Sequence, residues 1–365
     1  PWKPSNIPPI VRVMSRKPDT ELRKGWTTGA CATAATKAAL EALWGGQFPP
    51  DVSLTLPKGE TPVFAVAFSD QGPGWAEVGV LKDAGDDPDV THGALIRARV
   101  EAGENGVSFH AGVGVGMVTK PGLPIAVGEP AINPVPRQMM EQVVTEQAQN
   151  FGQTPDIKIT ITIPGGQELA AKTWNPRLGI VGGLSVLGTT GIVRPFSCAA
   201  WIASIHRGVD VAIATGQDHV AGCTGSTSET TVQRLYDLPD HAMLDMGDFA
   251  GGVLKYLRRH KVKRLTIGGG IGKISKLAQG VMDLHSARSQ VDFGVLNDWS
   301  QAAGLADVSD ANTALEAVEI AGAGLAQIVA TRAKLHVDEF LADGCDTDIV
   351  VIDRAGNILG RAPAK

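Results

Sequence analysis

The chain is organised around residues 178–197, which read Leu178-Gly-Ile-Val-Gly-Gly-Leu-Ser-Val-Leu-Gly-Thr-Thr-Gly-Ile-Val-Arg-Pro-Phe-Ser197. No charged residue lies between Arg177 and Arg194, and five glycines interrupt the short runs of Ile, Val and Leu. Apolar runs bounded by glycine are typical of a strand buried on both faces, as in a parallel sheet. A tight turn at the end of a core strand is the alternative. Gly188-Thr-Thr-Gly191 offers small residues where the backbone can approach a ligand closely, so this turn is a candidate binding loop.

Length and composition indicate a globular protein of two domains. A chain of 365 residues exceeds the usual size of one domain, and 43% hydrophobic residues with 19% charged residues disfavour disorder. A net charge of −5 gives no basic footprint for nucleic acid. No apolar run matches a membrane span or a signal peptide, so we expect a cytoplasmic protein.

Cysteine and histidine spacing points away from a metal centre. The four cysteines are far apart, without a C-x-x-C pair, and the eight histidines are equally scattered. Such spacing indicates reduced, mostly buried thiols and no dedicated metal site.

The first half predicts an α+β domain at 21–150, preceded by a proline-rich arm at 1–20. Residues 30–43 are rich in small side chains and predict a helix that packs closely on a flat surface. Thr27 and Thr28 can cap it, and an anion could bind at its N-terminus. Five segments with period-two alternation follow and predict strands. They begin near residues 52, 63, 75, 95 and 107. A helix at 135–149, with Asn133 as its cap, ends the domain.

An acidic loop lies inside this domain. Four carboxylates occur between Asp83 and Asp89, and His92 follows them. Crowded carboxylates repel one another, so one of them can hold its proton near neutral pH and act as acid or base. We single out Asp86 and His92 as proton carriers. A solvated Asp-Pro-Asp turn is the alternative reading.

The second half, residues 151–365, predicts a doubly wound α/β domain with a mainly parallel sheet. Strands are expected at 157–163, 209–215, 264–267 and 291–295, and a terminal hairpin at 349–359. Helices are expected at 196–206, 226–236, 247–260, 274–285, 311–321 and 325–340. Ligands bind beyond the carboxyl ends of such strands, which directs attention to Thr215 and Gly216.

Two further loops carry candidate ligand contacts. Gly268-Gly-Gly-Ile-Gly-Lys273 is not a Walker A sequence, since glycine and Ser or Thr are missing at 267 and 274. Lys273, Lys276 and His285 could bind carboxylates, although lysines on a first helical turn are commonly just exposed. Asp248 stands at a helix start, where it is either an ordinary cap or a ligand for a ribose diol.

Several blocks of the sequence, taken together, resemble the CbiD family. They occur in the family's order and span about residues 20–290, and they include Leu22-Arg-Lys-Gly-Trp-Thr-Thr-Gly29, Asp83-Ala-Gly-Asp-Asp-Pro-Asp-Val-Thr-His-Gly93, Gly128-Glu-Pro-Ala-Ile-Asn-Pro-Val-Pro-Arg137, the segment from Asn175 to Pro195, and Gly272-Lys-Ile-Ser-Lys276 to Ser286. The sequence departs from the family pattern at 196–200 and at Gly270, so no role is carried over there.

The resemblance implies transfer of a methyl group from S-adenosylmethionine to C-1 of precorrin-5B, or of its cobalt complex, during cobalamin biosynthesis. It also implies an α+β N-terminal domain joined to a Rossmann-like α/β domain. A non-catalytic corrinoid carrier and a small-molecule phosphotransferase are the competing functions. The presence of cobalt in the substrate and any homo-oligomer are left open.

The chemistry of methyl transfer to a polyacidic ring assigns three sets of residues. Proton transfer falls to Asp86 and His92. The donor is expected to contact Gly188, Thr189, Thr190, Gly191, Thr215, Gly216 and Asp248. The carboxylates of the tetrapyrrole are expected to meet Arg137, Arg194, Lys273, Lys276 and His285.

Overall fold

The structure is a computed structural model that describes residues 21–342 and 344–364. The predicted arm at 1–20 lies outside these residues. Two lobes, each built on a five-stranded sheet, flank the helix α4 (Cys198–Ala214). We refer to residues 21–193 as the first lobe and to the described residues from 215 onward as the second lobe, so that α4 lies between them. The fold is therefore mixed α/β, with sheets of mixed orientation.

The sheet of the first lobe has the strand order β4-β5-β6-β10-β7. All neighbours pair antiparallel except β10 and β7, which run parallel. The strands are β4 (Phe68–Gly72), β5 (Trp75–Leu81), β6 (Leu95–Ala102), β7 (Val107–Ala111) and β10 (Ile157–Thr162).

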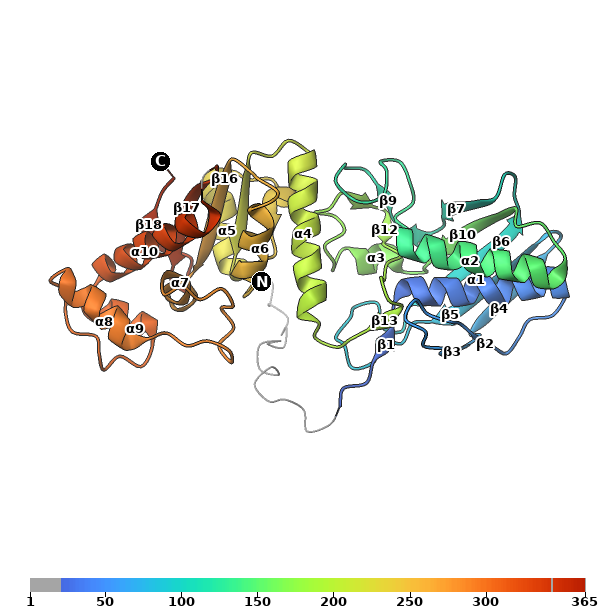
Figure 1. Cartoon of the computed structure of the whole chain (residues 1–365), viewed down its shortest axis with the longest axis horizontal. Coiled ribbons are helices and arrows are strands. Elements are labelled where there is room, and N and C mark those ends of the chain that lie inside the picture. The colour runs from blue at the N-terminus through green and yellow to red at the C-terminus, as the bar shows by residue number, and fades with distance from the viewer. Residues whose placement is uncertain (1–20, 343, 365) are drawn as a thin grey trace, which may run out of the picture.

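Two parallel helices, α1 (Thr28–Gly45) and α2 (Pro134–Phe151), lie side by side on this sheet (Figure 1). Gly29 lies against Pro136 and Gly45 against Phe151, so both N-termini are at the same end. Helix α1 is buried through most of its length because Ala, Gly, Cys and Thr let it approach β5 and β6 closely. This confirms the predicted helix, and the Thr27 hydroxyl caps it by accepting a hydrogen bond from the Ala30 amide. Asn133 occupies the N-cap of α2 without a side-chain capping bond.

Residues 178–193 lie in the first lobe, where they contribute one strand to each of three short two-residue ladders. The buried-strand interpretation of this stretch is therefore wrong, because its glycines turn the chain between ladders. The pairs are β11 (Ile180–Val181) with β9 (Met117–Val118), β12 (Gly183–Leu184) with β8 (Gly114–Val115), and β13 (Ile192–Val193) with β1 (Gly25–Trp26). The lobe also contains α3 (Gly166–Ala170) and the ladder of β2 (Asp51–Ser53) with β3 (Val63–Ala65).

The sheet of the second lobe has the strand order β15-β14-β16-β17-β18 and is parallel except for β18. One face packs against α4, α6, α7 and α10, and the other against α5. The strands are β14 (His219–Cys223), β15 (Met243–Leu244), β16 (Arg264–Gly270), β17 (Asp346–Ile352) and β18 (Ile358–Ala362). The helices are α5 (Ser226–Tyr236), α6 (Ala250–Leu257), α7 (Ile271–Ala278), α8 (Phe293–Ala302), α9 (Ala314–Ala321), α10 (Ala323–Leu341) and the 3-10 turn η2 (Asp240–Ala242).

Three sequence predictions are corrected here. The strand at 157–163 is β10, which pairs inside the first sheet, so the first lobe extends beyond residue 150. Residues 209–215 are the last turns of α4, because Ile205, Val209 and Ala212 are buried at helical spacing. The strand expected at 291–295 is instead the start of α8. The strand β14 was not predicted.

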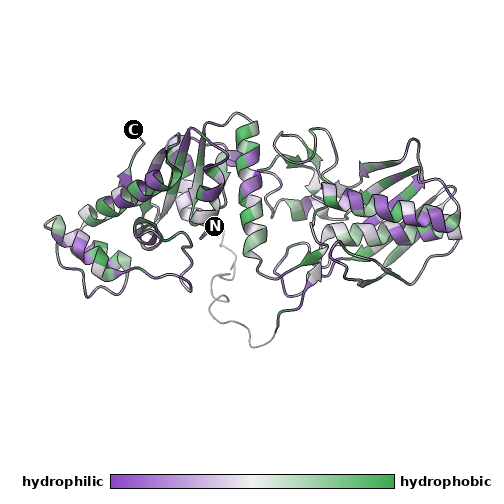
Figure 2. Ribbon diagram, viewed as in Figure 1, coloured by the Kyte–Doolittle hydropathy of each residue, from purple (hydrophilic) through white to green (hydrophobic). Residues whose placement is uncertain are grey.

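Helix α4 packs against both lobes. Figure 2 shows hydrophobic residues along much of its length. Ile205, Val209 and Ala212 join the core of the second lobe, and Val211 joins a cluster with Leu178 and Ile180 of the first. Polar contacts also cross between the lobes, among them Lys120, which lies 2.9 Å from His241, and Arg177, which pairs with Glu229. Within the described residues, no helix is long and apolar enough to cross a membrane.

Gly122 provides a test of the packing between the first lobe and α4. Its φ is +106°, and a Cβ there would lie 2.6 Å from the Asp210 carbonyl oxygen. We expect Gly122→Ala to cost about 2–3 kcal/mol of unfolding free energy in urea titrations, because it adds a clash to the backbone strain.

Gly182→Ala is the matched control. Gly182 has a φ of +89°, with no described atom within 4 Å of the added carbon, so only the strain of about 1 kcal/mol remains. Equal losses in the two variants would show that α4 is not tightly packed at Gly122.

Candidate active site

The loop at 187–191 wraps around the N-terminus of α1. The Thr27 amide donates to the Gly191 carbonyl and the Gly29 amide to the Leu187 carbonyl, both at 2.9 Å. A Cβ on Gly188 would lie 2.3 Å from the Thr27 hydroxyl oxygen, so this glycine is required by packing within the protein. Thr190 bonds to the backbone of Ile192, whereas Thr189 is exposed. The loop therefore lies at the surface, with Thr189 as its open side chain.

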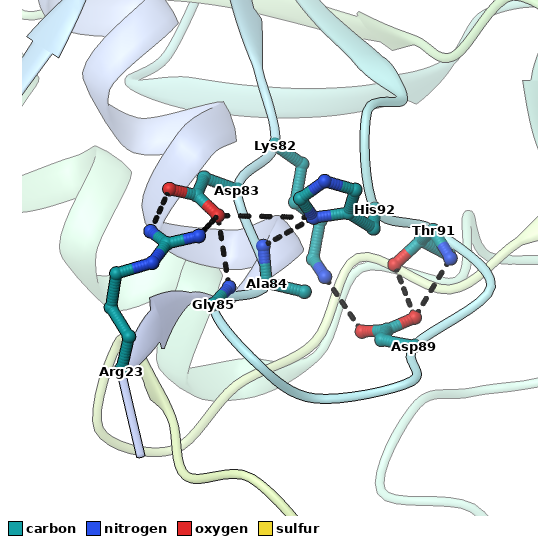
Figure 3. Close-up of polar contacts among 8 residues, drawn as sticks. All are labelled: Arg23, Lys82, Asp83, Ala84, Gly85, Asp89, Thr91 and His92. Atoms are coloured by element: carbon teal, nitrogen blue, oxygen red, sulfur yellow. Dashed lines mark hydrogen bonds and ion pairs between the residues drawn. The ribbon is translucent and has the colours of Figure 1, made fainter. Parts of the chain in front are cut away.

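The acidic loop is held by ion pairs and backbone contacts (Figure 3). Arg23 forms an ion pair with Asp83, and its amide donates to Asp86 at 2.6 Å. Asp89 accepts hydrogen bonds from the buried Lys82 ammonium at 2.6 Å and from Thr91. His92 Nδ1 accepts a hydrogen bond from the Ala84 amide at 3.1 Å, and Nε2 has no hydrogen-bond partner among the described residues.

These partners remove the expected effect of crowding. The hydrogen bond and charge of Arg23 lower the pKa of Asp83 to about 2. Burial acts to raise the pKa of Asp89, but Lys82 and Thr91 outweigh it and the net shift is downward. The expectation that crowding keeps a proton on the loop is therefore wrong for these two carboxylates, since a cation faces each of them.

The acidic loop, the start of α1 and the 187–196 segment form one group, which we call the α1 cluster. The Trp26 amide donates to the Asp83 carbonyl at 2.7 Å, and Gly25 packs directly on Ala84. The Phe196 amide donates to Asp87 at 2.8 Å. Three segments that are distant in the sequence thus meet at one end of the first lobe.

A second group, which we call the sheet-edge cluster, lies at the carboxyl ends of β14, β15 and β16. Lys273 pairs with Asp248 at 2.9 Å and donates to the Thr224 carbonyl at 2.9 Å. Thr224 is 8% exposed, and its hydroxyl has no hydrogen-bond partner among the described residues. This oxygen lies over Gly269, where a Cβ would come within 2.6 Å of it. The Thr224 hydroxyl therefore lies over the backbone of the neighbouring strand β16, at the carboxyl end of the paired strands.

Asp245 also lies at this edge and was not identified from the sequence. Burial, and then the neighbouring Glu229, raise the pKa of Asp245 to about 6, while Arg177 and the Trp174 side chain act in the opposite direction. Arg177 and Trp174 belong to the first lobe, and Arg177 pairs with Glu229 at 2.5 Å. In the sequence, Asp245 directly follows the apolar run 242–244. This position indicates a carboxylate at a strand end only if the run is recognised as the strand β15.

The first turn of α4 lies between the two clusters (Figure 1). Phe196 contacts the α1 cluster, and Trp201 donates from its indole nitrogen to the Asp245 carbonyl at 2.8 Å. Cys198 lies 3.3 Å from Arg288. Just before this turn, Arg194 is exposed and forms no hydrogen bond or ion pair with any residue that the structure describes. Thr189, Thr190 and Arg194 are thus accessible rather than sealed in the core.

Other residues predicted as ligand contacts lie outside the two clusters or are bonded within the protein. Thr215 and Gly216 cap the C-terminus of α4, roughly 20 Å along the helix from Trp201 at 1.5 Å per residue. The strand-end position predicted for this pair is therefore wrong, and Thr215 and Gly216 lie apart from Asp248 and the sheet-edge residues. Lys276 is buried and donates to the Leu284 and Ser289 carbonyls, and burial lowers its pKa.

Arg137 and His285 are held by local contacts. Arg137 donates to the Ile132 carbonyl at 2.9 Å and pairs with Glu129, at the edge of a pocket of about 400 Å³. His285 accepts a hydrogen bond from the Ala287 amide through Nδ1. In the described part of the chain, no group of three or more His, Cys, Asp or Glu side chains could hold a metal ion.

The fold and these two clusters define a two-lobed α/β protein whose candidate functional groups lie beside the helix that joins the lobes. The family model CbiD matches residues 15–195, and the model of the CbiD C-terminal domain matches 283–363. The chain belongs to the CbiD family. This confirms the resemblance seen in the sequence.

Individual relatives agree with this family. A cobalt-precorrin-5B C(1)-methyltransferase of Brucella anthropi is 58% identical over 93% of this chain and 96% of its own, and one of Brucella canis is 57% identical over the same shares. A crystal structure of the cobalamin biosynthesis protein cbiD from Archaeoglobus fulgidus is 26% identical, covers 73% of this chain and 83% of its own, and superposes with a TM-score of 0.40.

Asp245 predicts a pH dependence of stability. Its carboxyl group binds a proton more tightly in the folded than in the unfolded protein, so its contribution to stability falls as pH rises from about 4 through about 6. We expect Asp245→Asn to stabilise the protein by about 1–2 kcal/mol at pH 8, a value that allows for partial solvent screening, and to have no such effect below pH 4.

Thermal or urea unfolding across pH measures this difference. Asp310→Asn, which removes an exposed carboxylate, is the control for the loss of one negative charge. An Asp245→Asn protein that is no more stable than its parent at pH 8 would contradict the assigned shift.

Proposed function

We propose that the protein transfers a methyl group from S-adenosylmethionine to C-1 of precorrin-5B, in its cobalt form, beside the first turn of α4. That the chain is a methyltransferase of cobalamin biosynthesis follows from its family and from relatives of that name at 57–58% identity over nearly the whole chain. These relatives are the observation that carries the proposal. Donor, substrate and site are our inference, as is action in the cytoplasm.

The donor is proposed to bind at the sheet-edge cluster. In chain order the strands of the second sheet lie 2-1-3-4-5. This is a doubly wound order of the flavodoxin-like type rather than the Rossmann order, and in such sheets ligands bind where successive connections leave to opposite faces. That point lies between β14 and β16, where the Thr224 hydroxyl lacks a described partner and substituents on Gly225 and Gly270 would meet no described atom within 4 Å. Asp248 is the carboxylate available to the ribose hydroxyls. S-adenosylmethionine supplies the activated methyl group on its sulfonium.

The tetrapyrrole is proposed to bind against the α1 cluster. Its carboxylates need cations, and Arg194 is exposed without a described partner. Lys24 is also exposed, and it leaves the β1–β13 ladder at the same end as Arg194, because Gly25 pairs with Val193. Two like charges at one end of a ladder repel each other, so an anionic ligand between them relieves that repulsion. The exposed Thr189 hydroxyl lies in the same cluster and can donate a hydrogen bond to a carboxylate. The N-terminus of α1 is not open to an anion, because its amides donate to Leu187, Gly191 and the Thr27 side chain, which corrects the expectation from the sequence.

The protein's own part in the reaction is to align the two ligands and to exclude water. Asp86 and His92 remain our proposed proton carriers, with His92 using Nε2 because Nδ1 is occupied by the Ala84 amide. Asp245 joins them, since a pKa of about 6 suits proton exchange near neutral pH.

The direct test is to incubate the pure protein with S-adenosylmethionine and cobalt-precorrin-5B and to measure product mass. We expect a gain of one methyl group. A protein that binds the tetrapyrrole but neither binds S-adenosylhomocysteine nor gives this gain would be the carrier instead.

Two substitutions should separate the ligand sites. We expect Arg194→Ala to weaken tetrapyrrole binding about tenfold, because it removes a forked contact to carboxylate, and to leave S-adenosylhomocysteine affinity unchanged. Asp248→Asn should show the reverse pattern by calorimetry. Arg259→Ala, an exposed arginine beyond the end of α6, is the control. If both variants bind both ligands normally, the proposed crevice is misplaced.

A further inference from the structure

Trp201 is an exposed aromatic side chain in a fixed position. Its indole is 45% exposed, although large apolar rings usually bury most of their surface. The ring nitrogen donates to the Asp245 carbonyl at 2.8 Å, and the Phe249 ring packs against it at 6.1 Å between centroids with a 52° tilt. The chain thus orders a large apolar ring while leaving much of it accessible to solvent.

The contacts of Trp201 place it beside the sheet-edge cluster. It touches Asp245, Gly247 and Phe249, and its six-membered ring lies 3.5 Å from where a Cβ on Gly247 would be. Asp248 lies within this same loop. Because β15 is the edge strand of the second sheet, no further strand lies beyond it. Helix α4 therefore borders the 245–249 loop on that side.

We propose that Trp201 is the platform on which the adenine base of the methyl donor stacks. This inference rests on the proposed function and adds to it the residue that recognises the base. In an adenosine group the base and the ribose hydroxyls are carried by one sugar. A ribose at Asp248 therefore places the base within reach of the Trp201 ring, which packs on the neighbouring Gly247. A flat base on a flat indole gains dispersion and hydrophobic energy without requiring a particular hydrogen-bond pattern.

The tetrapyrrole is the less suitable partner for this ring. Trp201 is bonded and packed to the 245–249 loop, which belongs to the sheet-edge cluster. Phe196, also exposed, is bonded to the acidic loop, and Arg194 lies two residues before it. A ligand on the α1 cluster therefore meets Phe196 before it meets Trp201.

Calorimetry with S-adenosylhomocysteine tests the platform on two variants of the full chain. Trp201→Leu keeps an apolar side chain but removes the flat ring, and we expect about tenfold weaker binding. Trp201→Phe keeps a flat but smaller ring and loses the bond to the Asp245 carbonyl, and we expect affinity within about threefold of the parent. Tetrapyrrole affinity should be unchanged in both.

Fluorescence supplies a second readout that does not depend on the Leu variant folding. Stacked adenine should quench part of the tryptophan emission of the parent protein, and Trp201→Phe should abolish that part. Trp299→Phe, which alters a tryptophan on α8 that packs with Arg332, is the matched control and should retain it.

The outcomes are distinct. Unchanged S-adenosylhomocysteine affinity in Trp201→Leu, or quenching that survives in Trp201→Phe, overturns the platform while leaving the proposed function intact. Weaker tetrapyrrole binding with unchanged S-adenosylhomocysteine binding also overturns it and assigns the ring to the substrate. Failure of the parent protein to bind S-adenosylhomocysteine contradicts the proposed donor itself, and the platform with it.

Discussion

The packing of α4 against both lobes is the constraint on which the rest of the structure depends. Ile205, Val209 and Val211 are fully buried, and each such side chain contributes about 1.5–3 kcal/mol by leaving water. The polar contacts between the lobes are worth less, because the Arg177–Glu229 pair is partly exposed and such pairs contribute about 1 kcal/mol or less. Apolar packing therefore holds the lobes together, while Arg177 and Lys120 determine where the first lobe sits on the second. The packing of α4 therefore fixes the position of the α1 cluster relative to the sheet-edge cluster.

Burial, rather than the local density of charge, decides which carboxylates have unusual proton affinity. The acidic loop holds four Asp residues within seven positions, yet Asp83 and Asp89 ionise more readily than an isolated carboxylate because Arg23 and Lys82 face them. Asp245 has no acidic neighbour closer in sequence than Asp248, and its pKa rises because the two lobes remove it from water beside Glu229. Arg177 lowers this cost without removing it. A carboxylate held in that condition is typical of functional sites.

Much of the fold could be predicted from the local sequence pattern. The predictions that were wrong share one cause, which is that they depend on contacts between distant segments. Alternation correctly predicted β5, β6 and β10, and the threonine cap with its small residues correctly predicted α1. The pattern could not show that β10 inserts between β6 and β7, because that pairing joins segments about 60 residues apart. Residues 209–215 fit both a strand and a helix, and only the position of Ile205 four residues before Val209 favours the helix. That one error placed Thr215 at a strand end and so in the donor site.

The site was less predictable than the fold because its parts come from elements that meet only in three dimensions. Thr27, Asp86 and Arg194 were recognised as separate motifs, and the structure shows that their segments are one cluster. Asp245, Trp201 and the Thr224 hydroxyl carry no motif. Their interest comes from a half-buried carboxylate, an accessible indole and a hydroxyl without a hydrogen-bond partner among the described residues, which are properties of packing rather than of sequence.

The junction between the lobes also contains a residue with a strained backbone. Phe196 adopts a φ of +55°, a left-handed conformation that costs a non-glycine residue about 1–2 kcal/mol. The bond from its amide to Asp87 compensates part of that cost and places the strained residue against the acidic loop. A glycine at position 196 would relieve the strain, but it would also remove an exposed aromatic ring from the surface of the α1 cluster. The chain instead keeps a strained aromatic residue where the first lobe ends and α4 begins, and strain of this kind persists where the surrounding structure fixes the backbone for function.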